Sequence, residues 1–536
     1  MTTKVSKGSA FQDKIQKGIN TLADTVKDTL GPLGNTVVLV DEYNRKTITK
    51  DGVTVAKSFE ELEDPIEDIG ASLVKDVSTK VNTLAGDGTT TATVLAQAMF
   101  NNGSKKISLG ATPLEFKKGM QKATADVIEN LMSSRKVIKS DSPEVMDVAM
   151  VSSNGDKKVA EIITKIYKEL GPNAVISTKH GDGLETTVDL VKGMQFDRGY
   201  LATYCITDDI KMRTDFNNPY IFLYDGKISE VKQIYEALEA AGKADRPLVI
   251  VAEEVIESAL RALVVNHVSG NVKSAIVQTP GYGKKRLERL EDMGILFGGQ
   301  VIDKDFNMET FTSDMLGEAE KAEITSETTA FVGGAGKIEN IEARVAHIKS
   351  KLEHFKNNDY QAKFLEERLG KLTSGVSVIK VGAYSNEEAR EMLDRVDDCK
   401  FAVKAALEEG IIDGGGVSFL FASSFLEAKM EKRLKEESES FKEGYKSLLE
   451  SIKSPFRQVL SNAGEVYQVV ENVLLSVDDA VYGYDVRNKE YISTMSSKGI
   501  VDPFKVARVA LESSVSIIGT LLTSNYSVIN TKKEKV

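Results

Sequence analysis

A run of glycine, aspartate and threonine at residues 86–95 is the strongest candidate for chemistry in this chain, and it reads Gly-Asp-Gly-Thr-Thr-Thr-Ala-Thr-Val-Leu. Glycines let backbone amides approach a ligand, and the residues that follow can begin a helix, whose N-terminus favours phosphate. Asp87 stands where it could hold Mg²⁺, which prefers carboxylates together with phosphate oxygens and water. The alternative is a capped turn, because Asp and Thr are common at helix N-caps.

Three further segments could serve a phosphate site, although each also has an ordinary structural interpretation. Thr29–Gly34 and residues 414–416 are glycine-rich turns that permit close backbone approach. Thr49–Gly52 brings a lysine and an aspartate to a turn. Asp397 and Asp398 are paired carboxylates, one of which could deprotonate a water, although most such pairs are solvated helix surface. We find no P-loop pattern, no Ser/His/Asp set and no kinase signature.

The composition narrows the partners and the compartment. A net charge of −11 disfavours nucleic acid and anionic membranes as partners. Cys205 and Cys399 lie far apart, so neither a disulfide nor a zinc site with the 4 histidines is expected. No apolar run is long enough for a transmembrane helix, and Met1–Lys14 lacks the features of a secretory signal. We expect a cytoplasmic protein that, at 536 residues, has several domains.

The elements that must position these residues follow a helical, then α/β, then helical order. The first helix is predicted from an apolar stripe that Gly31-Pro32 ends, and its members are Phe11, Ile15, Ile19, Leu22, Val26 and Leu30. In the middle of the chain, β-rich runs alternate with helical stretches, which indicates an α/β domain with a partly parallel sheet. The predicted strands are 220–224, 247–252 and 274–278, and the predicted helices are 230–241 and 255–268.

The last third of the chain has its own expectations. Residues 338–371 are highly charged with helical spacing and predict a long helical hairpin. Helix signals return from Asn386, and the lysine-rich residues 531–536 are expected to be disordered.

Taken together, these motifs resemble those of the group I chaperonins, the GroEL family, in matching order and spacing from about Phe11 to about Asn530. The matching segments are Thr29–Gly34, Thr49–Gly52, Gly86–Leu95, Gly193–Leu201, Val378–Ala383, Asp398 and Gly414–Gly416. The resemblance implies a multidomain α and α/β chaperonin fold with a helical equatorial domain, a small intermediate domain and an α/β apical domain. The implied bounds are 1–135 and 410–536 for the equatorial domain, 136–191 and 377–409 for the intermediate domain, and 192–376 for the apical domain.

The resemblance also implies the roles of individual residues. The ATP-binding residues would be Thr29, Leu30, Gly31, Pro32, Lys50, Asp87, Gly88, Thr89, Thr90, Thr91, Gly415, Asp485, Val486 and Asp502. Asp87 would ligate Mg²⁺, Thr29 and Lys50 would lie near K⁺, and Asp398 would activate the attacking water with help from Asp51. An apical apolar groove for unfolded client proteins would comprise Tyr200, Leu201, Tyr204, Tyr235, Leu238, Leu260, Val264 and Val265.

The function that the resemblance implies is that of an ATP-dependent chaperone, which promotes folding in a ring cavity driven by ATP hydrolysis. The implied assembly is a homo-oligomer, a heptameric ring that is single or double, and the need for a co-chaperonin lid stays open. Two alternatives also stay open: a ring that holds clients passively with little ATP turnover, and a metabolic ATP-using enzyme on an unrelated fold. Neither nucleic acid nor a membrane is expected as a partner.

The chain departs from the family pattern in four places. It ends Thr531–Val536 where the family has a Gly-Gly-Met repeat, and Cys205 replaces an aromatic residue of the client groove. Tyr484-Asp485-Val486 stands where Tyr-Asn-Ala is usual. Glu465-Val466 stands where two glutamates are usual, so Arg457 would lose a partner across a ring–ring contact. These departures leave the nucleotide preference and the number of rings open.

Overall fold

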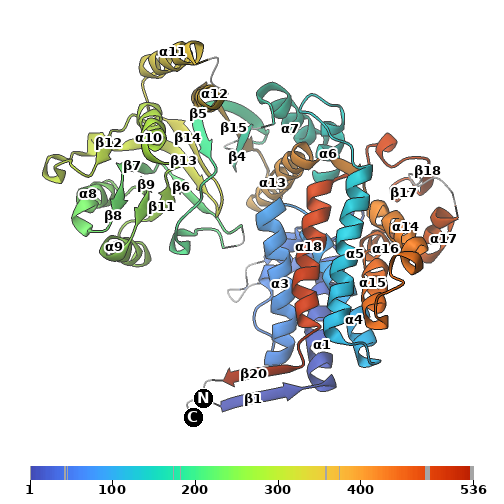
Figure 1. Cartoon of the computed structure of the whole chain (residues 1–536). Helices are drawn as coiled ribbons and strands as arrows, with labels where there is room; N and C mark the ends of the chain where they lie inside the picture. Colours follow the sequence, from blue (N-terminus) through green and yellow to red (C-terminus); the bar gives the residue numbers. More distant parts are fainter. Residues whose placement is uncertain are drawn as a thin grey trace. The chain divides into compact units, whose positions relative to one another are not determined.

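The computed structural model describes the chain except for residues 1, 41–43, 45, 173, 182, 210, 356–358, 374, 477–482 and 532–536. Two compact units divide it, one built from residues 1–172 with 384–536 and the other from residues 173–383. The two ends of the chain therefore fold together, and the middle forms a separate body (Figure 1). The finer five-part division stays a prediction. Disorder was predicted for 531–536; Thr531 instead ends a strand that pairs with the N-terminus, and 532–536 lie outside the described residues.

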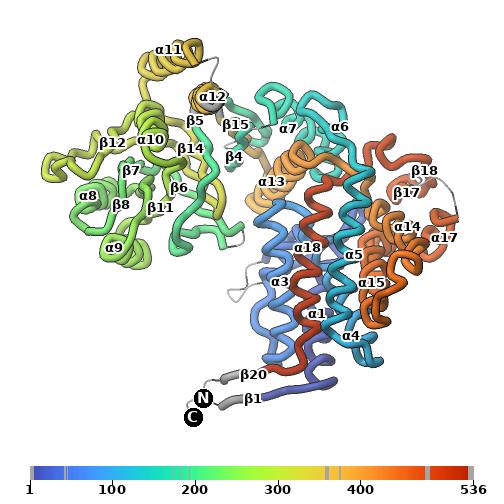
Figure 2. The backbone as a smooth tube through the Cα atoms, in the orientation of Figure 1, coloured from blue at the N-terminus to red at the C-terminus, as the bar shows by residue number. Residues whose placement is uncertain are grey.

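The first unit is mostly helical. Its helices are α1 (Ser9–Lys27), α2 (Gly52–Ser58), α3 (Pro65–Ala85), α4 (Thr89–Ser108), α5 (Pro113–Ser134), α6 (Glu144–Ser152), α7 (Lys157–Leu170), α13 (Asn386–Glu409), α14 (Val417–Arg433), α15 (Glu439–Ser451), α16 (Ser454–Asn462), α17 (Tyr467–Leu475) and α18 (Phe504–Leu521). The long helices α3, α5 and α18 run side by side (Figure 2), and α4 packs against α3 and α18. Segments from the two ends of the sequence thus share one hydrophobic core.

Helix α1 shows why this core forms. Its apolar stripe is buried as predicted, since Ile15 and Ile19 are both 0% exposed and pack in the shared core. The helix ends at Lys27 and not at Gly31-Pro32, so Leu30 lies beyond it. The physical reason is local, because the Thr29 hydroxyl donates to the Val26 carbonyl at 2.9 Å and draws the chain into a turn.

Short strands complete the first unit in antiparallel pairs. The pairs are β1 (Thr2–Lys7) with β20 (Tyr526–Thr531), β2 (Val37–Val40) with β3 (Lys46–Thr49), β16 (Ile411–Asp413) with β19 (Val501–Pro503), and β17 (Gly483–Asp485) with β18 (Glu490–Ile492). The first pair joins the two ends of the chain, with Thr2 opposite Thr531. The third pair places residues 414–416 beside the segment that carries Asp502.

The second unit is built on a mixed sheet. The strand order is β11 (Ser274–Gln278), β9 (Leu248–Ala252), β7 (Tyr220–Asp225), β13 (Gly317–Ile324), β14 (Thr329–Gly334), β5 (Thr187–Phe196), β15 (Gly375–Val381) and β4 (Val175–His180). Two short strands lie off this path, β12 (Val301–Asp303) beside β7 and β6 (Thr214–Asn217) beside β13. A separate parallel pair is β8 (Lys227–Ile228) with β10 (Glu254–Val255). Strands β7, β9, β11 and β12 pair in parallel, which confirms the predicted partly parallel sheet.

Helices cover both faces of the parallel part of the sheet (Figure 1). They are α8 (Tyr235–Lys243), α9 (Glu257–Val268) and α10 (Gly283–Phe297), and two further helices, α11 (Ile338–His354) and α12 (Asp359–Thr373), pack against α10. Ile221 and Leu223 pack in the cluster that includes α10, α11 and α12, whereas Phe222 and Tyr224 pack in the cluster that includes α8 and α9. Both faces of these strands are therefore buried, which is why they read as continuous apolar runs in the sequence.

One predicted helix of this unit begins later than expected. Residues 230–241 were predicted as a single helix, but the segment opens with a 3₁₀ turn at Val231–Gln233 and α8 starts only at Tyr235. A capping box between Glu230 and Gln233 fixes this turn, because each side chain accepts from a backbone amide of the other residue.

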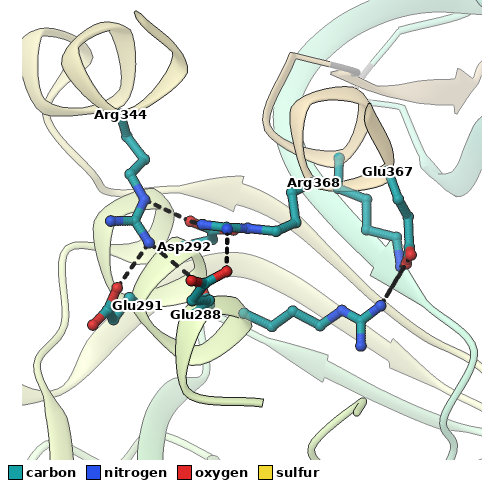
Figure 3. A network of polar contacts seen from close by, with 8 residues as sticks. Glu288, Glu291, Asp292, Arg344, Glu367 and Arg368 are labelled. Atoms are coloured by element: carbon teal, nitrogen blue, oxygen red, sulfur yellow. Dashed lines mark hydrogen bonds and ion pairs between the residues drawn. The ribbon is translucent and has the colours of Figure 1, made fainter. Parts of the chain in front are cut away.

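The charged segment 338–371 forms the predicted helical hairpin, α11 and α12, and a network of ion pairs holds it on α10 (Figure 3). Arg368 of α12 donates two bonds to Asp292 of α10, at 2.6 and 2.9 Å, and Arg344 of α11 donates a third at 2.7 Å. Arg368 and Asp292 are only 3% and 2% exposed. Because the buried carboxylate is engaged by two guanidinium groups, some of the charges in this highly charged segment have a structural role.

Candidate functional site

The turn that carries Asp87 lies between two left-handed glycines. Gly86 (φ 72°) ends α3 and Gly88 (φ 84°) begins α4. A Cβ on Gly86 would lie 2.4 Å from the Phe401 ring of α13, and a Cβ on Gly88 would lie 2.4 Å from Val506 of α18. Glycine is therefore needed here for both conformation and space. Thr89, Thr90 and Thr91 form the first turn of α4, and no side chain caps its amides at Gly88, which leaves the amides available to an anion.

Two further predicted segments meet this helix start. The Thr29 hydroxyl lies 3.4 Å from the Thr90 hydroxyl, and a Cβ on Gly52 would lie only 2.1 Å from the same Thr90 oxygen. Lys50 donates through Nζ to the carbonyl oxygen of Gly31 at 3.0 Å, which fastens the second segment to the first. The segments 29–34, 50–52 and 86–91, far apart in sequence, are thus in direct contact.

The turn at residues 29–34 is itself held in place. Gly31 is left-handed (φ 84°) and packs against Val459 of α16. Asn462 of the same helix donates to the Leu30 carbonyl oxygen at 2.9 Å. Pro32 follows Gly31 in the turn and is partly exposed.

Carboxylates gather beside these segments and influence one another. Asp51 caps α2, where it accepts the Val53 and Thr54 amides at 3.1 and 2.9 Å. Burial, and next the charge of Asp51, raise the pKa of Asp87, whose carboxylate accepts from the Gly88 amide. Burial and the charge of Asp87 raise the pKa of Asp502 to about 7. Each raised pKa means that the ionised carboxylate is unfavourable where it stands, and a bound cation would stabilise it.

Asp502 joins the glycine-rich turn at residues 414–416 to the same place. The backbone amides of Gly415 and Gly416 donate to its carboxylate. Gly415 is left-handed (φ 68°), and a Cβ there would lie 3.3 Å from the Met495 methyl group. The structure therefore brings Gly415 and Asp502 together.

Asp398 lies on α13, and neighbouring residues place this part of the helix near Asp87. Burial, and next the charges of Asp398 and Asp87, raise the pKa of the Cys399 thiol, so both carboxylates lie near that sulfur. Phe401 packs on Gly86, in the turn that carries Asp87. Within the same helix, Lys400 and Asp397 form a buried ion pair, 2.8 Å apart.

Two of the residues predicted to bind the nucleotide, Asp485 and Val486, make their contacts within their own turn and a neighbouring apolar cluster. Asp485 is buried, and its carboxylate accepts from the Arg487 amide at 2.9 Å and from the Asn488 side chain at 2.7 Å, within its own turn. Val486 is buried in an apolar cluster that includes Tyr484. Their contact with a nucleotide stays a prediction.

The predicted client-binding residues all lie in the second unit, but their exposure differs. Leu201, Tyr235 and Val265 are 45%, 53% and 64% exposed. The other five are less accessible: Tyr200, Tyr204, Leu260 and Val264 are partly buried, and Leu238 is a core residue at 8% exposure. Val268, one turn after Val264 on α9 and not among the predicted residues, is 75% exposed.

Both cysteines are free, in line with the expectation of no disulfide. Among the described residues, no three His, Cys, Asp or Glu side chains are grouped so that they could hold a metal ion by themselves. Within the same residues, no helix combines the length and the apolar character needed to cross a bilayer.

Comparison with known proteins extends these observations to the whole chain. The model of the TCP-1/cpn60 chaperonin family matches residues 22–533. Two solved structures of similar fold are crystal forms II and I of the chaperonin gp146 from the bacteriophage EL 2 (Pseudomonas aeruginosa), both in the presence of ATP-BeFx. Form II is 21% identical with a TM-score of 0.67, and form I is 20% identical with a TM-score of 0.62. Each match covers 98% of this chain and 99% of that chain, so the likeness in fold is complete in length.

Proposed function

This chain belongs to the TCP-1/cpn60 chaperonin family, and from that premise we propose that it is an ATP-dependent chaperone which binds non-native proteins and promotes their folding in a ring cavity. The observation that carries the proposal is the meeting of segments 29–34, 50–52 and 86–91 at the start of α4. A helix start with free amides, three hydroxyls and a neighbouring lysine is suited to a polyphosphate.

We assign the candidate residues of the first unit the following roles in binding the nucleotide and its cations. The α4 amides and Thr89–Thr91 bind phosphate oxygens, while Gly415 and Asp502 contact the base and ribose. Asp87 ligates Mg²⁺, since burial and Asp51 raise its pKa and a cation relieves that cost. Bound there, Mg²⁺ would neutralise charge on the phosphates. Thr29 and Lys50 border a K⁺ site.

Asp398 acts as the base that orients and deprotonates the attacking water, with Asp51 in support. The place of Asp398 on α13 supports this role, because the charges of Asp398 and Asp87 both raise the pKa of the neighbouring Cys399 thiol. Asp398 lies on α13 and not on the segments that bind the phosphates, so small movements of α13 relative to those segments control hydrolysis.

The second unit binds clients through exposed apolar side chains. Leu201, Tyr235 and Val265 offer accessible apolar surface, and such contacts are non-directional, which suits diverse unfolded chains. A ring of identical subunits, which we take to be a heptamer, repeats the patch and adds avidity. A single or a double ring, a co-chaperonin lid and a cytoplasmic location all remain predictions.

The test is the Asp398→Ala variant in the full-length protein. We expect its ATP hydrolysis to fall about a hundredfold or more while ADP binding, measured by calorimetry, is retained. Glu387→Ala is the matched control, because it removes an exposed carboxylate from the same helix. Steady ATPase activity in Asp398→Ala would contradict the assignment of Asp398 as the catalytic base. Client capture that no nucleotide releases would instead identify a passive holding ring.

A further inference from the structure

The turn between α6 and α7, residues Asn154–Asp156, is held from one side by Arg487. The Arg487 guanidinium donates through Nη2 to the Asn154 carbonyl oxygen at 3.3 Å. It also packs on Gly155, where a Cβ would lie 2.8 Å from Nη1. Gly155 is left-handed (φ 87°), so both the backbone conformation and the space it leaves fit the arginine. Arg487 comes from the β17–β18 turn, which the Asp485 carboxylate stabilises.

From the other side, the same turn is held by the helix that carries Asp398. Arg395 of α13 donates through Nη1 to the Asp156 carboxylate at 3.2 Å. That carboxylate also caps α7, since it accepts the Lys158 amide at 3.0 Å. Arg395 lies one helical turn before Asp398, so the position of the α6–α7 turn and the position of Asp398 are mechanically linked.

Both arginines lie beside the nucleotide site proposed above. After burial, the charges of Arg487 and then Arg395 are the next causes that lower the pKa of Lys50, so both guanidinium groups are close to that lysine. Lys50 in turn donates to Gly31 in the candidate phosphate turn.

We propose that Arg487 is a positioning residue for hydrolysis: it holds the α6–α7 turn and thereby, through Asp156 and Arg395, sets where α13 presents Asp398. This inference rests on the proposed function and adds to it a residue that acts on the rate of hydrolysis and not on nucleotide affinity. The guanidinium is exposed and its contacts are to the α6–α7 turn, so its loss leaves the core of the unit intact.

The test compares Arg487→Gln with Lys489→Gln. Lys489 lies in the same turn and is also an exposed cation, but its partner is different, since it pairs with Glu465 at 3.0 Å. We expect Arg487→Gln to lower kcat about three- to tenfold, the loss expected for one ordinary hydrogen bond, while the Kd for ADP changes less than about twofold. Arg487→Lys should recover part of the rate, and Lys489→Gln should match the wild type.

A double variant separates positioning from general damage. Combined with Asp398→Ala, Arg487→Gln should cause no further loss, because its effect passes through Asp398. A kcat equal to that of Lys489→Gln overturns the proposal. A raised Kd for ADP with an unchanged kcat also overturns it, because Arg487 would then contact the nucleotide.

A measurement without nucleotide distinguishes failure of this inference from failure of the proposed function. Amide hydrogen exchange at Gly155 and Asp156, whose amides bond to Met150 and Ser153, should quicken in Arg487→Gln and not in Lys489→Gln. Unchanged exchange would refute the link itself. A wild-type chain that neither binds nor hydrolyses ATP would refute the proposed function, whatever the exchange shows.

Discussion

Gly52 is the residue at which the candidate site has least room. A methyl group there would lie 2.1 Å from the Thr90 hydroxyl and 3.2 Å from that of Thr89. We expect Gly52→Ala to push α2 away from the start of α4, to weaken ADP binding at least about tenfold, and to cost about 1–3 kcal/mol of stability through overpacking. Calorimetry and urea denaturation measure the two effects.

The matched control is Gly370→Ala, on helix α12 of the second unit, where a Cβ meets no atom within 4 Å. Alanine there should stabilise its helix by up to about 1 kcal/mol and leave ADP binding unchanged. Tight ADP binding by Gly52→Ala would show that the close contact of α2 with α4 does not shape the site.

His267 gives the second unit a pH dependence at the scale of one side chain. Burial lowers its pKa; a hydrogen bond to Ser274 opposes this, and the charge of Lys273 lowers the pKa further. Since the folded pKa lies below the ordinary value of 6.5, the unfolded chain binds more protons and stability is lost as the pH falls through that value. We expect the midpoint of urea denaturation to drop between about pH 7.5 and about pH 5.5.

His267→Gln should reduce this drop, because glutamine does not titrate. His347→Gln, on the exposed face of α11, is the control that should leave the drop unchanged. An equal loss of stability in all three proteins would exclude His267 as the source.

At the scale of elements, the buried ion network decides whether the hairpin of α11 and α12 stays on α10. Asp292→Ala leaves Arg368 buried, at 3% exposure, without its bidentate partner. The expected cost is about 3–5 kcal/mol in the free energy of unfolding, as for other broken buried pairs. Glu367→Ala removes a more exposed partner, that of Arg289, and should cost less than about 1 kcal/mol. Similar denaturation midpoints for the two variants would contradict this account of the hairpin.

The same elements show how far sequence patterns reach. Strands β7, β9 and β11 were predictable because both of their faces are buried and the pattern is local. The charged stretch 338–371 was predictable as a helical hairpin, but its docking on α10 was not, because a buried arginine and a solvated one look alike in sequence. The end of α1 was misplaced, because a hydroxyl bond at Thr29 closes the turn before the glycine and proline do.

For the candidate site, glycine and aspartate motifs could be found from sequence because each marks a local backbone requirement. The left-handed Gly86 and Gly88 are examples. Phe401 and Arg487 were missed, since each gains its place only from a contact between distant segments. Leu238 was assigned to a surface because helical spacing alone does not tell which side of α8 faces the sheet.

At the scale of the whole molecule, Arg457 has its partners within the chain itself. Arg457 was expected to lose a partner across a ring–ring contact, and it is engaged in its own subunit instead. It donates to Glu471 at 2.7 and 2.8 Å and to Glu450 at 2.6 Å. Three of the five N–H donors of its guanidinium are thus used within the chain.

The client capture proposed above depends on the assembly as well as on the single subunit. Val265 on α9 is 64% exposed, so Val265→Ser removes apolar contact area without disturbing the core. Each engaged copy should lose about 1.5 kcal/mol of client binding, and a ring that engages several copies multiplies that loss. We therefore expect the apparent affinity for an unfolded client to fall more than about tenfold while the ATPase rate is unchanged.

Val137→Ser, which removes a 70% exposed valine from the first unit, should leave capture intact. Client capture is measured by the suppression of client aggregation. Equal capture by the two variants would mean that α9 is not the client surface. A loss no larger than one copy contributes would mean that the subunits do not act together.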